Sequence, residues 1–322
     1  MRVYRSLEEV PREFGPSALT IGNFDGVHYG HRQILRRVKA VAEEHGWRPS
    51  VLTFDPHPTR VVAPQRTPAL LTSPGRRAEL MAEEGIEQVL ILPFTKELAQ
   101  LSPEEFARQL PVAALGARAV LVGDNFRFGK DQAGNVAVLA ELGRQLGFTT
   151  EVVPAVTCRG RVVSSSGIRG LIRAGNAALA GRLLQHAYAL EGEVVSGRGV
   201  GSRQTVPTLN LATRAEVIPA TGVYLTRTRE TDGERAWNSI TNIGYRPTFG
   251  ASDELTIETF LLDAPEGAPP AHIRVEFLKR VREERKFANA EALKAQILRD
   301  VHLARNYFRR AKAWIGRECI SC

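Results

Sequence analysis

The sequence predicts an α/β fold in the amino-terminal half and a small antiparallel barrel or sandwich with a long terminal helix in the carboxyl-terminal half. In the first half, apolar strand-like runs alternate with helical stretches, which is typical of a parallel sheet covered on both faces. After about Ala187, short strand-like runs follow at close spacing with turn residues between them. The final stretch has apolar positions at helical spacing.

The elements of the first half follow in a regular order. Runs of apolar and β-branched residues predict strands, which are expected at Ser17–Phe24, Pro49–Pro56, Gln88–Phe94, Ala117–Phe126 and Thr149–Val156. Helical spacing predicts the helices between them, at about His28–Glu44, Arg76–Glu84, Ser102–Leu110 and Asn135–Gly147. Ser102 is a good N-cap because acidic residues follow it in the first turn.

The second half contains shorter elements. Its strands are expected at Leu190–Gly197, Thr208–Ala212, Gly222–Glu230, Ala236–Gly244, Leu255–Asp263 and His272–Val281. The long helix is expected at Asn289–Ile315. The change of pattern places the domain boundary near Leu184, with one domain over residues 1–184 and a second over 185–322.

Composition limits the protein's class. No apolar run reaches the roughly 18 residues of a membrane span, and the polar start lacks the apolar centre of a signal peptide. Three cysteines favour a reducing cytoplasm over a disulfide framework; Cys319 and Cys322 form a C-x-x-C that we interpret as a tail. Lys and Arg exceed Asp and Glu by 43 to 35, a net charge of +8, which suits phosphates or nucleic acid.

The stretch Thr20–Leu35, TIGNFDGVHYGHRQIL, joins a strand to a helix. Gly22 and Gly26 permit unusual backbone angles, and the helix that follows points its N–H groups and positive dipole end at the turn. His28 and His31 lie three apart on one helical face, where two imidazoles can donate to phosphate oxygens. The alternative is a tight turn before a well-packed helix.

Other polar residues also follow strands, where parallel sheets bind ligands. These are Asp55, His57, Asp124 and Asn125. Further along, Ser164–Ser166 and Arg169 suit phosphate binding, or else form a capped helix with an exposed arginine. Phe126 and Phe128 either face a flat ligand ring or fill the core.

Two features of the second half suit chemistry on a nucleotide. Gly197–Ala212, GRGVGSRQTVPTLNLA, is a glycine-rich segment with basic side chains, and the oxygens of Thr208 and Asn210 suit a hard cation such as Mg²⁺. Taken alone, such a segment is usually a turn. Glu258 lies in a predicted strand with apolar neighbours. It is either a proton acceptor in a reaction or one residue of a solvent-exposed strand face.

Four motifs of the first half together resemble the nucleotidyltransferase module of bacterial bifunctional riboflavin kinase/FAD synthetases. They are Ile21–His31, Leu52–Pro58, Val122–Lys130 and Ser164–Arg169, with Ser166 in place of the family's usual threonine. The resemblance implies a Rossmann-like nucleotidyltransferase domain that transfers the adenylyl group of ATP to FMN. It implies an ATP site at Gly22, Phe24, Asp25, Gly26, His28, His31, Ser165, Ser166 and Arg169, with His28, His31 and Arg169 catalytic. It implies a flavin site at His57, Asn125, Phe126 and Phe128.

The second half resembles the riboflavin kinase module of the same family, which implies a small β-barrel. The family's P-T-A-N appears here with Leu209 for alanine, and Thr205-Val206 replaces its Gly-Phe. Glu258 matches the catalytic base, whereas the Leu-Tyr-Gly that often follows the Leu261–Asp263 strand is missing. The implied ATP site is Gly197, Gly199, Gly201, Ser202, Arg203, Thr208 and Asn210, with Mg²⁺ held by Thr208 and Asn210.

The resemblance implies a two-step enzyme that converts riboflavin and ATP to FMN, and then FMN and ATP to FAD. It implies small-molecule substrates, no nucleic-acid or membrane partner, and a cytoplasmic location; oligomeric state is not indicated. One alternative is an active transferase whose kinase half only binds flavin, because of Thr205, Val206 and the missing tyrosine. Another is a non-catalytic nucleic-acid binder on a basic α/β scaffold, although the basic residues are dispersed.

Overall fold

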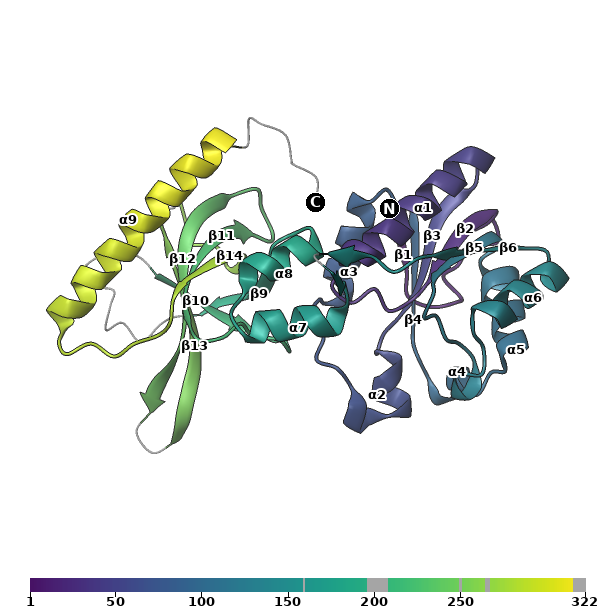
Figure 1. Ribbon diagram of the computed structural model, residues 1–322, viewed down its shortest axis with the longest axis horizontal. Helices are drawn as coiled ribbons and strands as arrows, with labels where there is room; N and C mark the ends of the chain where they lie inside the picture. The colour runs from purple at the N-terminus through teal and green to yellow at the C-terminus, as the bar shows by residue number, and fades with distance from the viewer. Residues whose placement is uncertain (159, 196–207, 249–250, 264–266, 315–322) are drawn as a thin grey trace. The chain divides into compact units, whose positions relative to one another are not determined.

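The structure, a computed structural model, describes residues 1–158, 160–195, 208–248, 251–263 and 267–314. The chain divides into two compact units, residues 1–166 and 167–322. The first unit contains a six-stranded sheet and the second contains a closed barrel (Figure 1). The predicted α/β half and antiparallel half are therefore confirmed, and the second half is a barrel, not a sandwich.

All neighbouring strands of the first sheet are parallel, in the order β1-β4-β3-β2-β5-β6. Their bounds are β1 (Arg2–Tyr4), β2 (Ser17–Ile21), β3 (Arg48–Phe54), β4 (Gln88–Leu92), β5 (Ala117–Gly123) and β6 (Thr149–Val153). From β2 the chain proceeds to β3 and β4 on one side, and then crosses to β5 on the other. The carboxyl ends of β2 and β5 therefore meet at a switch point, where open α/β sheets bind ligands.

Helices cover both faces of this sheet. The helical elements are α1 (Tyr29–His45), α2 (Pro58–Val62), η1 (Pro64–Arg66), α3 (Pro74–Glu83), α4 (Lys96–Ala99), α5 (Pro103–Ala107), η2 (Arg108–Ala114), η3 (Lys130–Gln132) and α6 (Val136–Leu146). Apolar residues of α1 and α3 pack on one face, and those of α5, η2 and α6 on the other. A short hairpin of β7 (Thr157–Cys158) and β8 (Arg161–Val162) follows β6.

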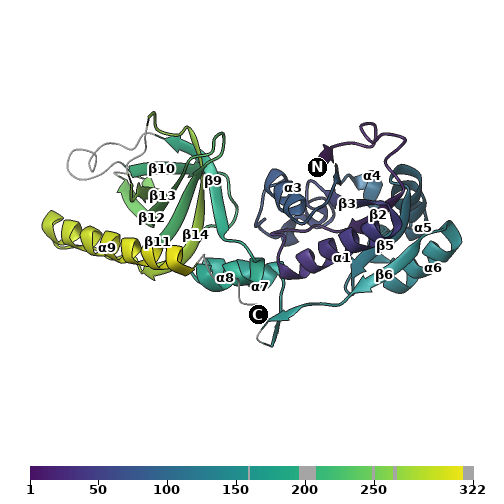
Figure 2. The ribbon, with the colours of Figure 1, turned by 90° about the horizontal axis from the view of Figure 1, so that it is seen from above.

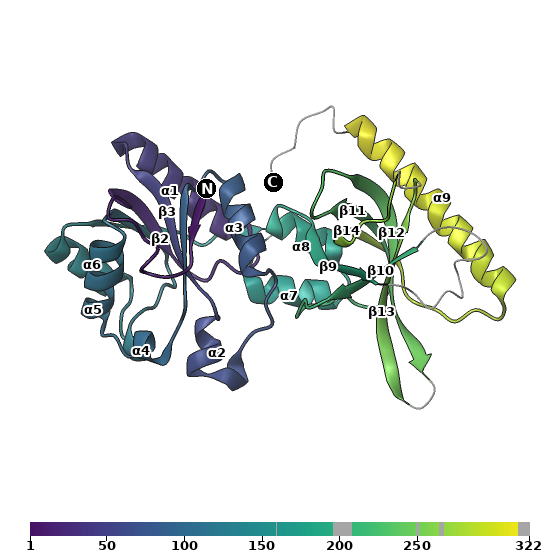
Figure 3. The ribbon, with the colours of Figure 1, turned by 180° about the vertical axis from the view of Figure 1, so that it is seen from behind.

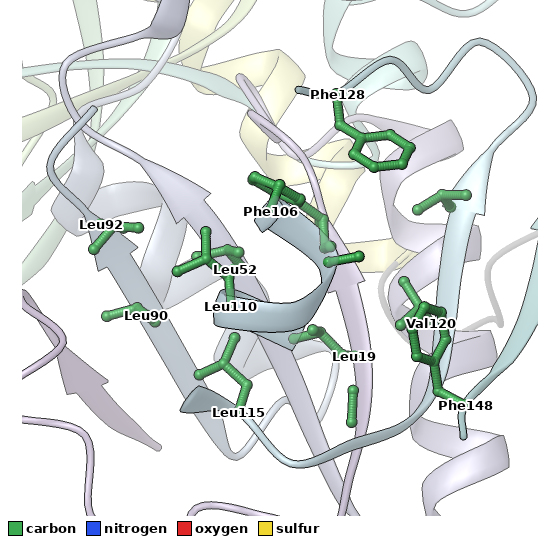
Figure 4. Close-up of a cluster of buried hydrophobic side chains, with 14 of the residues drawn as sticks. Leu19, Leu52, Leu90, Leu92, Phe106, Leu110, Leu115, Val120, Phe128 and Phe148 are labelled. Carbon is green, nitrogen blue, oxygen red and sulfur yellow. The ribbon is translucent and has the colours of Figure 1, made fainter. Parts of the chain in front are cut away.

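Alternation along the central strands builds these two cores. Leu19 and Leu52 point to the same side as Phe106 and Leu110 (Figure 4). Ala18 and Val51, their sequence neighbours, point to the opposite side, where they meet α1 and α3. Successive strand residues alternate between faces, so a strand covered on both sides is apolar throughout.

Two of the differences from the sequence prediction have a clear physical cause. The predicted helix Ser102–Leu110 begins as α5 with a capping box between Ser102 and Glu105, but continues as the π-helical η2 through Pro111. Proline has no N–H to donate, which disfavours a regular α-helix at that point. The sequence does not predict edge strand β1, because three residues are too few to show an alternation of apolar and polar side chains.

Helix α7 (Ser165–Arg173) spans the division between the two units, and the second unit continues through α8 (Ala177–Leu184) into the barrel, whose strand order is β10-β13-β12-β11-β14-β9. The barrel strands are β9 (Tyr188–Val195), β10 (Thr208–Thr213), β11 (Gly222–Glu230), β12 (Ala236–Thr248), β13 (Ala251–Leu261) and β14 (His272–Arg282), and the long helix is α9 (Ala290–Trp314). The paired strands β12 and β13 are long and extend beyond the rest of the barrel (Figure 3).

The two faces of the barrel wall carry different side chains. Hydroxyl groups point inward and hydrogen-bond across strands, such as Thr226 to Ser239 at 2.8 Å and Thr241 to Thr259 at 3.0 Å. The alternate residues, including Leu225 and Ile240, point outward and pack with α9, which runs along the outside of the barrel (Figure 2). A residue's position in this alternation therefore decides whether ligands can reach it.

Candidate functional sites

The first candidate site is the turn that joins β2 to α1 at the switch point. Phe24, Gly26 and Val27 all have positive φ, at 49°, 82° and 38°. Such angles cost energy for side chains with a Cβ, and strained backbone clusters at functional sites. The turn is therefore held by contacts outside itself. It brings the predicted residues Gly22, Phe24, Asp25, Gly26, His28 and His31 into one corner.

His28 and His31 form a stacked pair at the start of α1. Their ring centroids are 3.6 Å apart and the planes differ by 14°. Nδ1 of His28, the N-cap, accepts from the backbone N–H of His31 at 3.3 Å. The neutral His28 ring therefore carries its proton on Nε2. Added at Gly30, a Cβ would lie 3.3 Å from the His28 ring, so glycine there leaves room for that ring.

The charge state of His31 follows from its surroundings. Burial, then His28, then Arg77 hold the pKa of His31 well below its ordinary value. Its Nδ1 is buried and has no hydrogen-bond partner among the described residues. At neutral pH His31 is therefore an uncharged ring with hydrogen-bonding capacity to spare.

This neutral histidine makes the folded protein sensitive to acid. Because the folded-state pKa of His31 lies well below 6.5, the unfolded chain binds a proton there that the folded chain does not as pH falls through 6.5. The free energy of unfolding then decreases by up to about 1.4 kcal/mol for each unit by which the pH falls. Above the pKa that His31 has in the unfolded chain, this decrease does not occur. We expect His31→Gln to narrow the difference in melting temperature between about pH 7.5 and pH 5.0. An unchanged difference would contradict this account.

Asp25 anchors the turn to the loop before α3. Its Oδ1 accepts from the backbone N–H of Leu71 at 2.9 Å and of Thr72 at 3.2 Å. Thr72 Oγ1 in turn accepts from the N–H of Gly26 at 3.0 Å. Asp25 is only 3% exposed. The Asp25 carboxylate therefore holds the turn against the loop before α3. The predicted contact of Asp25 with ATP stays a prediction.

The next motif lies against the same turn. The side-chain amide of Asn23 lies 3.0 Å from Nε2 of His57, the N-cap of α2. Nδ1 of His57 accepts from the N–H of Thr59 at 3.2 Å. His57 is therefore held in a fixed orientation beside the first motif.

The third motif continues β5 on the other side of the switch point. Asp124 and Asn125 are exposed there and Phe126 is half-buried. Phe128 is 5% exposed and packs in the core between Phe106 and Phe126, at centroid distances of 5.5 and 5.4 Å. Asn125 and Phe126 are therefore the more accessible of the predicted flavin residues.

The fourth motif begins α7. Ser165 Oγ donates to the backbone carbonyl of Asp25 at 2.9 Å, which joins the fourth motif to the first. Ser166 is exposed, whereas Arg169, one turn further on, is 8% exposed. The alternative of an exposed arginine on a capped helix is wrong, since Arg169 is buried.

The second candidate site is a row of polar side chains across three barrel strands. Glu258 on β13 pairs directly with Asn210 on β10 and with Asn242 on β12. Directly paired residues point to the same face with Cβ atoms about 5 Å apart. The row lies on the outer face, because Thr241 and Thr259, one position along each strand, point inward. Glu258 is half-buried there, and Thr208 lies beside Phe260 in the next row.

The same row continues toward α9. Asn242 pairs with Val223, which pairs with Arg282. The guanidinium of Arg282 donates to Oδ2 of Asp300 on α9 at 2.9 and 3.0 Å. Asp300 is 6% exposed. This partly buried ion pair holds α9 against the barrel beside the row, so one edge of the candidate site has a fixed wall.

Several predicted residues lie outside the described part of the chain. They are Gly197, Gly199, Gly201, Ser202, Arg203, Thr205, Val206, Cys319 and Cys322. Thr208 and Asn210, the other two of the predicted kinase ATP site, are described and lie on β10.

A cavity of about 360 Å³ lies at the amino-terminal ends of β2, β3 and β5, and its lining includes Gly15, Trp47 and Gly116 but no predicted site residue. Among the described residues, no three His, Cys, Asp or Glu gather as a metal site. No helix in the described ranges is long and apolar enough to cross a membrane.

Sequence reasoning missed two residues at these sites. Arg77 on α3 is 2% exposed and donates to the backbone carbonyl of Asn23 at 2.6 Å. Asn242 lies beside Glu258. The sequence does not single out Arg77, because Arg76 next to it is the same residue type. Only burial in the folded protein distinguishes the two arginines. Strand alternation could have placed Asn242 on the face of Glu258, but not next to it, because pairing register is tertiary information.

Comparison with known proteins gives two family matches. The model described as FAD synthetase matches residues 10–167, and the one described as riboflavin kinase matches residues 184–308. A bifunctional riboflavin kinase/FMN adenylyltransferase of Pseudomonas fluorescens is 37% identical, over 95% of this chain and 97% of its own. Those of Escherichia coli K12 and Bacillus subtilis are 36% and 33% identical, over 96% and 93% of this chain and 97% and 95% of their own.

A solved structure shares the fold over nearly the whole chain. It is described as a macrolide-efflux protein from Streptococcus pneumoniae, with a TM-score of 0.82, 25% identity, and coverage of 95% of this chain and 98% of its own. Macrolide efflux is an activity named for that protein alone. Fold similarity does not transfer an activity, so this match supports the architecture.

Proposed function

The chain belongs to the family of bifunctional riboflavin kinase/FMN adenylyltransferases, and from this premise we propose where each of its two reactions takes place. The enzyme phosphorylates riboflavin to FMN with ATP, and then transfers the adenylyl group of a second ATP to FMN. The alternative of a kinase half that only binds flavin is not favoured, because the full-length relatives are named for both activities. We assign adenylylation to the switch-point turn and phosphorylation to the outer row of the barrel.

In adenylyl transfer, an oxygen of the FMN phosphate attacks the α-phosphorus of ATP and pyrophosphate leaves. The nucleophile is already an anion, so the site has to position the phosphates and stabilise charge. His28 and His31 donate to the triphosphate beside the start of α1, and Ser165, Ser166 and Arg169 bind it from α7. Gly22, Phe24, Asp25 and Gly26 shape the turn. The contact of Ser165 with Asp25 supports this grouping.

The flavin of this first site is proposed to contact His57, Asn125, Phe126 and Phe128. His57 supports the proposal because its ring is fixed beside the turn through Asn23. Asn125 and Phe126 support it because they follow the strand next to β2 and are accessible. Phe128 contributes by packing behind Phe126.

In riboflavin phosphorylation, Glu258 accepts the proton of the 5′-hydroxyl of riboflavin as the hydroxyl oxygen attacks the γ-phosphorus of ATP, and ADP leaves. The observation that carries this assignment is the pairing of Glu258 with Asn210 on an accessible face of the barrel. The transfer depends on positioning and on neutralising phosphate charge. The segment with Gly197, Gly199, Gly201, Ser202 and Arg203 is proposed to hold the nucleotide together with Thr208 and Asn210.

Mg²⁺ is proposed as the metal of both reactions. Thr208 and Asn210 offer a hydroxyl and an amide oxygen two residues apart on one face of β10, next to Glu258. Mg²⁺ prefers oxygen ligands and usually binds through one or two protein groups together with substrate phosphates, so this donor set fits. When bound, it supplies charge neutralisation to the phosphates.

The proposal is tested by incubating the purified chain with riboflavin, ATP and Mg²⁺ and separating flavins by chromatography. We expect FMN to appear first and FAD after it, with FAD formation dependent on FMN. Omitting Mg²⁺ should stop both steps. Finding neither product from a folded protein would overturn the assignment.

Asn242 should matter for phosphorylation alone. It lies directly beside Glu258, and we expect its amide to keep that carboxylate oriented toward the substrate hydroxyl. Asn242→Ala should lower kcat for riboflavin phosphorylation by about tenfold, at the low end of the roughly 10–100-fold loss that follows removal of a side chain that orients a functional group. Adenylylation of FMN, measured on the same preparation, should remain at the wild-type rate. A wild-type phosphorylation rate would remove Asn242 from the site.

The remaining assignments follow from the family. We propose a functional boundary between residues 184 and 185, supported by a kinase match that begins at residue 184. We further propose that the enzyme is cytoplasmic and acts on small molecules, without a nucleic-acid or membrane partner. The dispersed basic residues support this, since nucleic-acid binders gather them on one face.

A further inference from the structure

Arg77 is a buried arginine placed directly beneath the switch-point turn. The anchoring of Thr72 by Asp25 fixes the loop that leads into α3. Ser73 then caps that helix through the N–H of Arg76, and Arg77 comes within its first turn. Its Nη1 donates to the carbonyl of Asn23 at 2.6 Å and lies 3.4 Å from Thr53 Oγ1.

The guanidinium of Arg77 has more hydrogen-bonding capacity than the described residues use. Its side chain is among the largest that are fully buried, and Nε has no hydrogen-bond partner in the described part of the chain. Burial lowers the pKa of Arg77, while the charges of Asp25 and Asp55 oppose this shift. An arginine in a protein remains protonated even so. A positive charge with unused donor capacity is therefore fixed below the turn.

We propose that Arg77 is a positioning residue for adenylyl transfer: it holds the turn through Asn23 and places a buried positive charge beneath the ATP phosphates. The proposal rests on the assignment of adenylylation to this turn. Asn23 also contacts His57, so Arg77 orients two motifs through one residue. A charge in a site that excludes water acts more strongly on phosphates than an exposed one, because the local dielectric is low.

Arg77 also affects His31. The titratable and charged groups near this ring are His28, stacked upon it, and Arg77, with Asp25 and Asp55 close to the guanidinium. The Arg77 charge adds to burial and to His28 in lowering the pKa of His31. His31 thereby stays neutral, and the stacked pair avoids carrying two charges. Removing the Arg77 charge should therefore raise the pKa of His31.

The test compares Arg77→Met and Arg77→Lys with a matched control, Arg76→Met, in the full-length chain. Arg76 is the preceding residue, and its guanidinium pairs with Glu79 at 2.7 Å and Glu83 at 3.6 Å, away from the turn. FMN adenylylation is measured against ATP concentration and pH. Riboflavin phosphorylation serves as the internal control, and circular dichroism melting reports folding.

We expect Arg77→Met to lower kcat/KM for adenylylation by about 100-fold and to raise the KM for ATP. Removal of one preorganised hydrogen-bond donor typically costs an enzyme about this much. Loss of adenylylation on acidification should begin at a higher pH than in wild type. Arg77→Lys keeps the charge, and its kcat/KM for adenylylation should be about tenfold higher than that of Arg77→Met. The kcat/KM of Arg76→Met should stay within about twofold of the wild-type value. Phosphorylation should be unchanged in all three.

Three results would overturn the proposal. One is wild-type adenylylation by folded Arg77→Met. Another is a folded Arg77→Lys as inactive as the methionine variant, which would exclude a role for the charge. The third is reduced melting temperature with normal kcat, KM and pH profile per folded molecule, which would make Arg77 purely structural. If His28→Ala also retained adenylylation, the site assignment itself would be wrong, and the two failures are thus distinguishable.

Discussion

Glu258→Gln abolishes riboflavin phosphorylation, with an expected loss of about 10³-fold in kcat, and leaves FMN adenylylation intact. The amide keeps the shape of the side chain but cannot accept the proton of the 5′-hydroxyl, and general bases contribute roughly 10²–10⁴-fold. Asn210 and Asn242 still flank the position, so substrate binding should change little. The measurement follows FMN formation from riboflavin and FAD formation from FMN on one preparation.

The same strand offers a control for this change. Glu254 lies four residues earlier on β13, on the same face but exposed, and pairs with Arg246 of β12. Glu254→Gln should phosphorylate riboflavin at the wild-type rate. Equal losses in the two variants would show that the effect is not specific to the row, and a loss of both activities in folded Glu258→Gln would contradict separate sites.

His31→Ala gives the opposite result, an expected loss of about 10²–10³-fold in FMN adenylylation with riboflavin phosphorylation retained. The neutral ring with unused hydrogen-bonding capacity is a preorganised donor for phosphate charge, and loss of one such donor typically costs this much. His28→Ala should behave similarly, since it removes the stacked partner and the N-cap acceptor of α1. Both are measured as FAD formed from FMN and ATP.

The control for the histidine variants lies at the other end of the same helix. His45 is exposed and stacks on Trp47 with centroids 4.4 Å apart, remote in sequence from the turn. His45→Ala should leave both activities unchanged. Adenylylation that survives in both folded His28→Ala and His31→Ala would place the reaction elsewhere.

The stability of the turn and its chemistry are coupled. The positive φ angles of Phe24 and Val27 and the burial of Arg77 are each unfavourable alone. They persist because Asp25 binds two backbone N–H groups and Arg77 holds the carbonyl of Asn23. A site that is rigid before ATP arrives needs little reorganisation when charge develops.

Much of the fold was predictable from local patterns. Alternation of strands and helices indicated the parallel sheet, and closely spaced short strands indicated the antiparallel half, because side-chain period reports which faces are buried. The π-helical continuation at Pro111 and the edge strand β1 were not predicted. A three-residue strand has no period to detect, and its pairing with β4 depends on residues far away in the chain.

The sequence by itself determined the class of each half, the family and the motifs, including His28, His31, Thr208, Asn210 and Glu258. Only the tertiary structure decided that Asn242 adjoins Glu258, that Asp25 is engaged by Leu71 and Thr72, and that Arg77 rather than Arg76 lies beneath the turn. The physical reason is that motifs record residue types along the chain. Strand register and burial, by contrast, arise from contacts between segments 16 to 54 residues apart, as with Asn242 and Glu258 or Asn23 and Arg77.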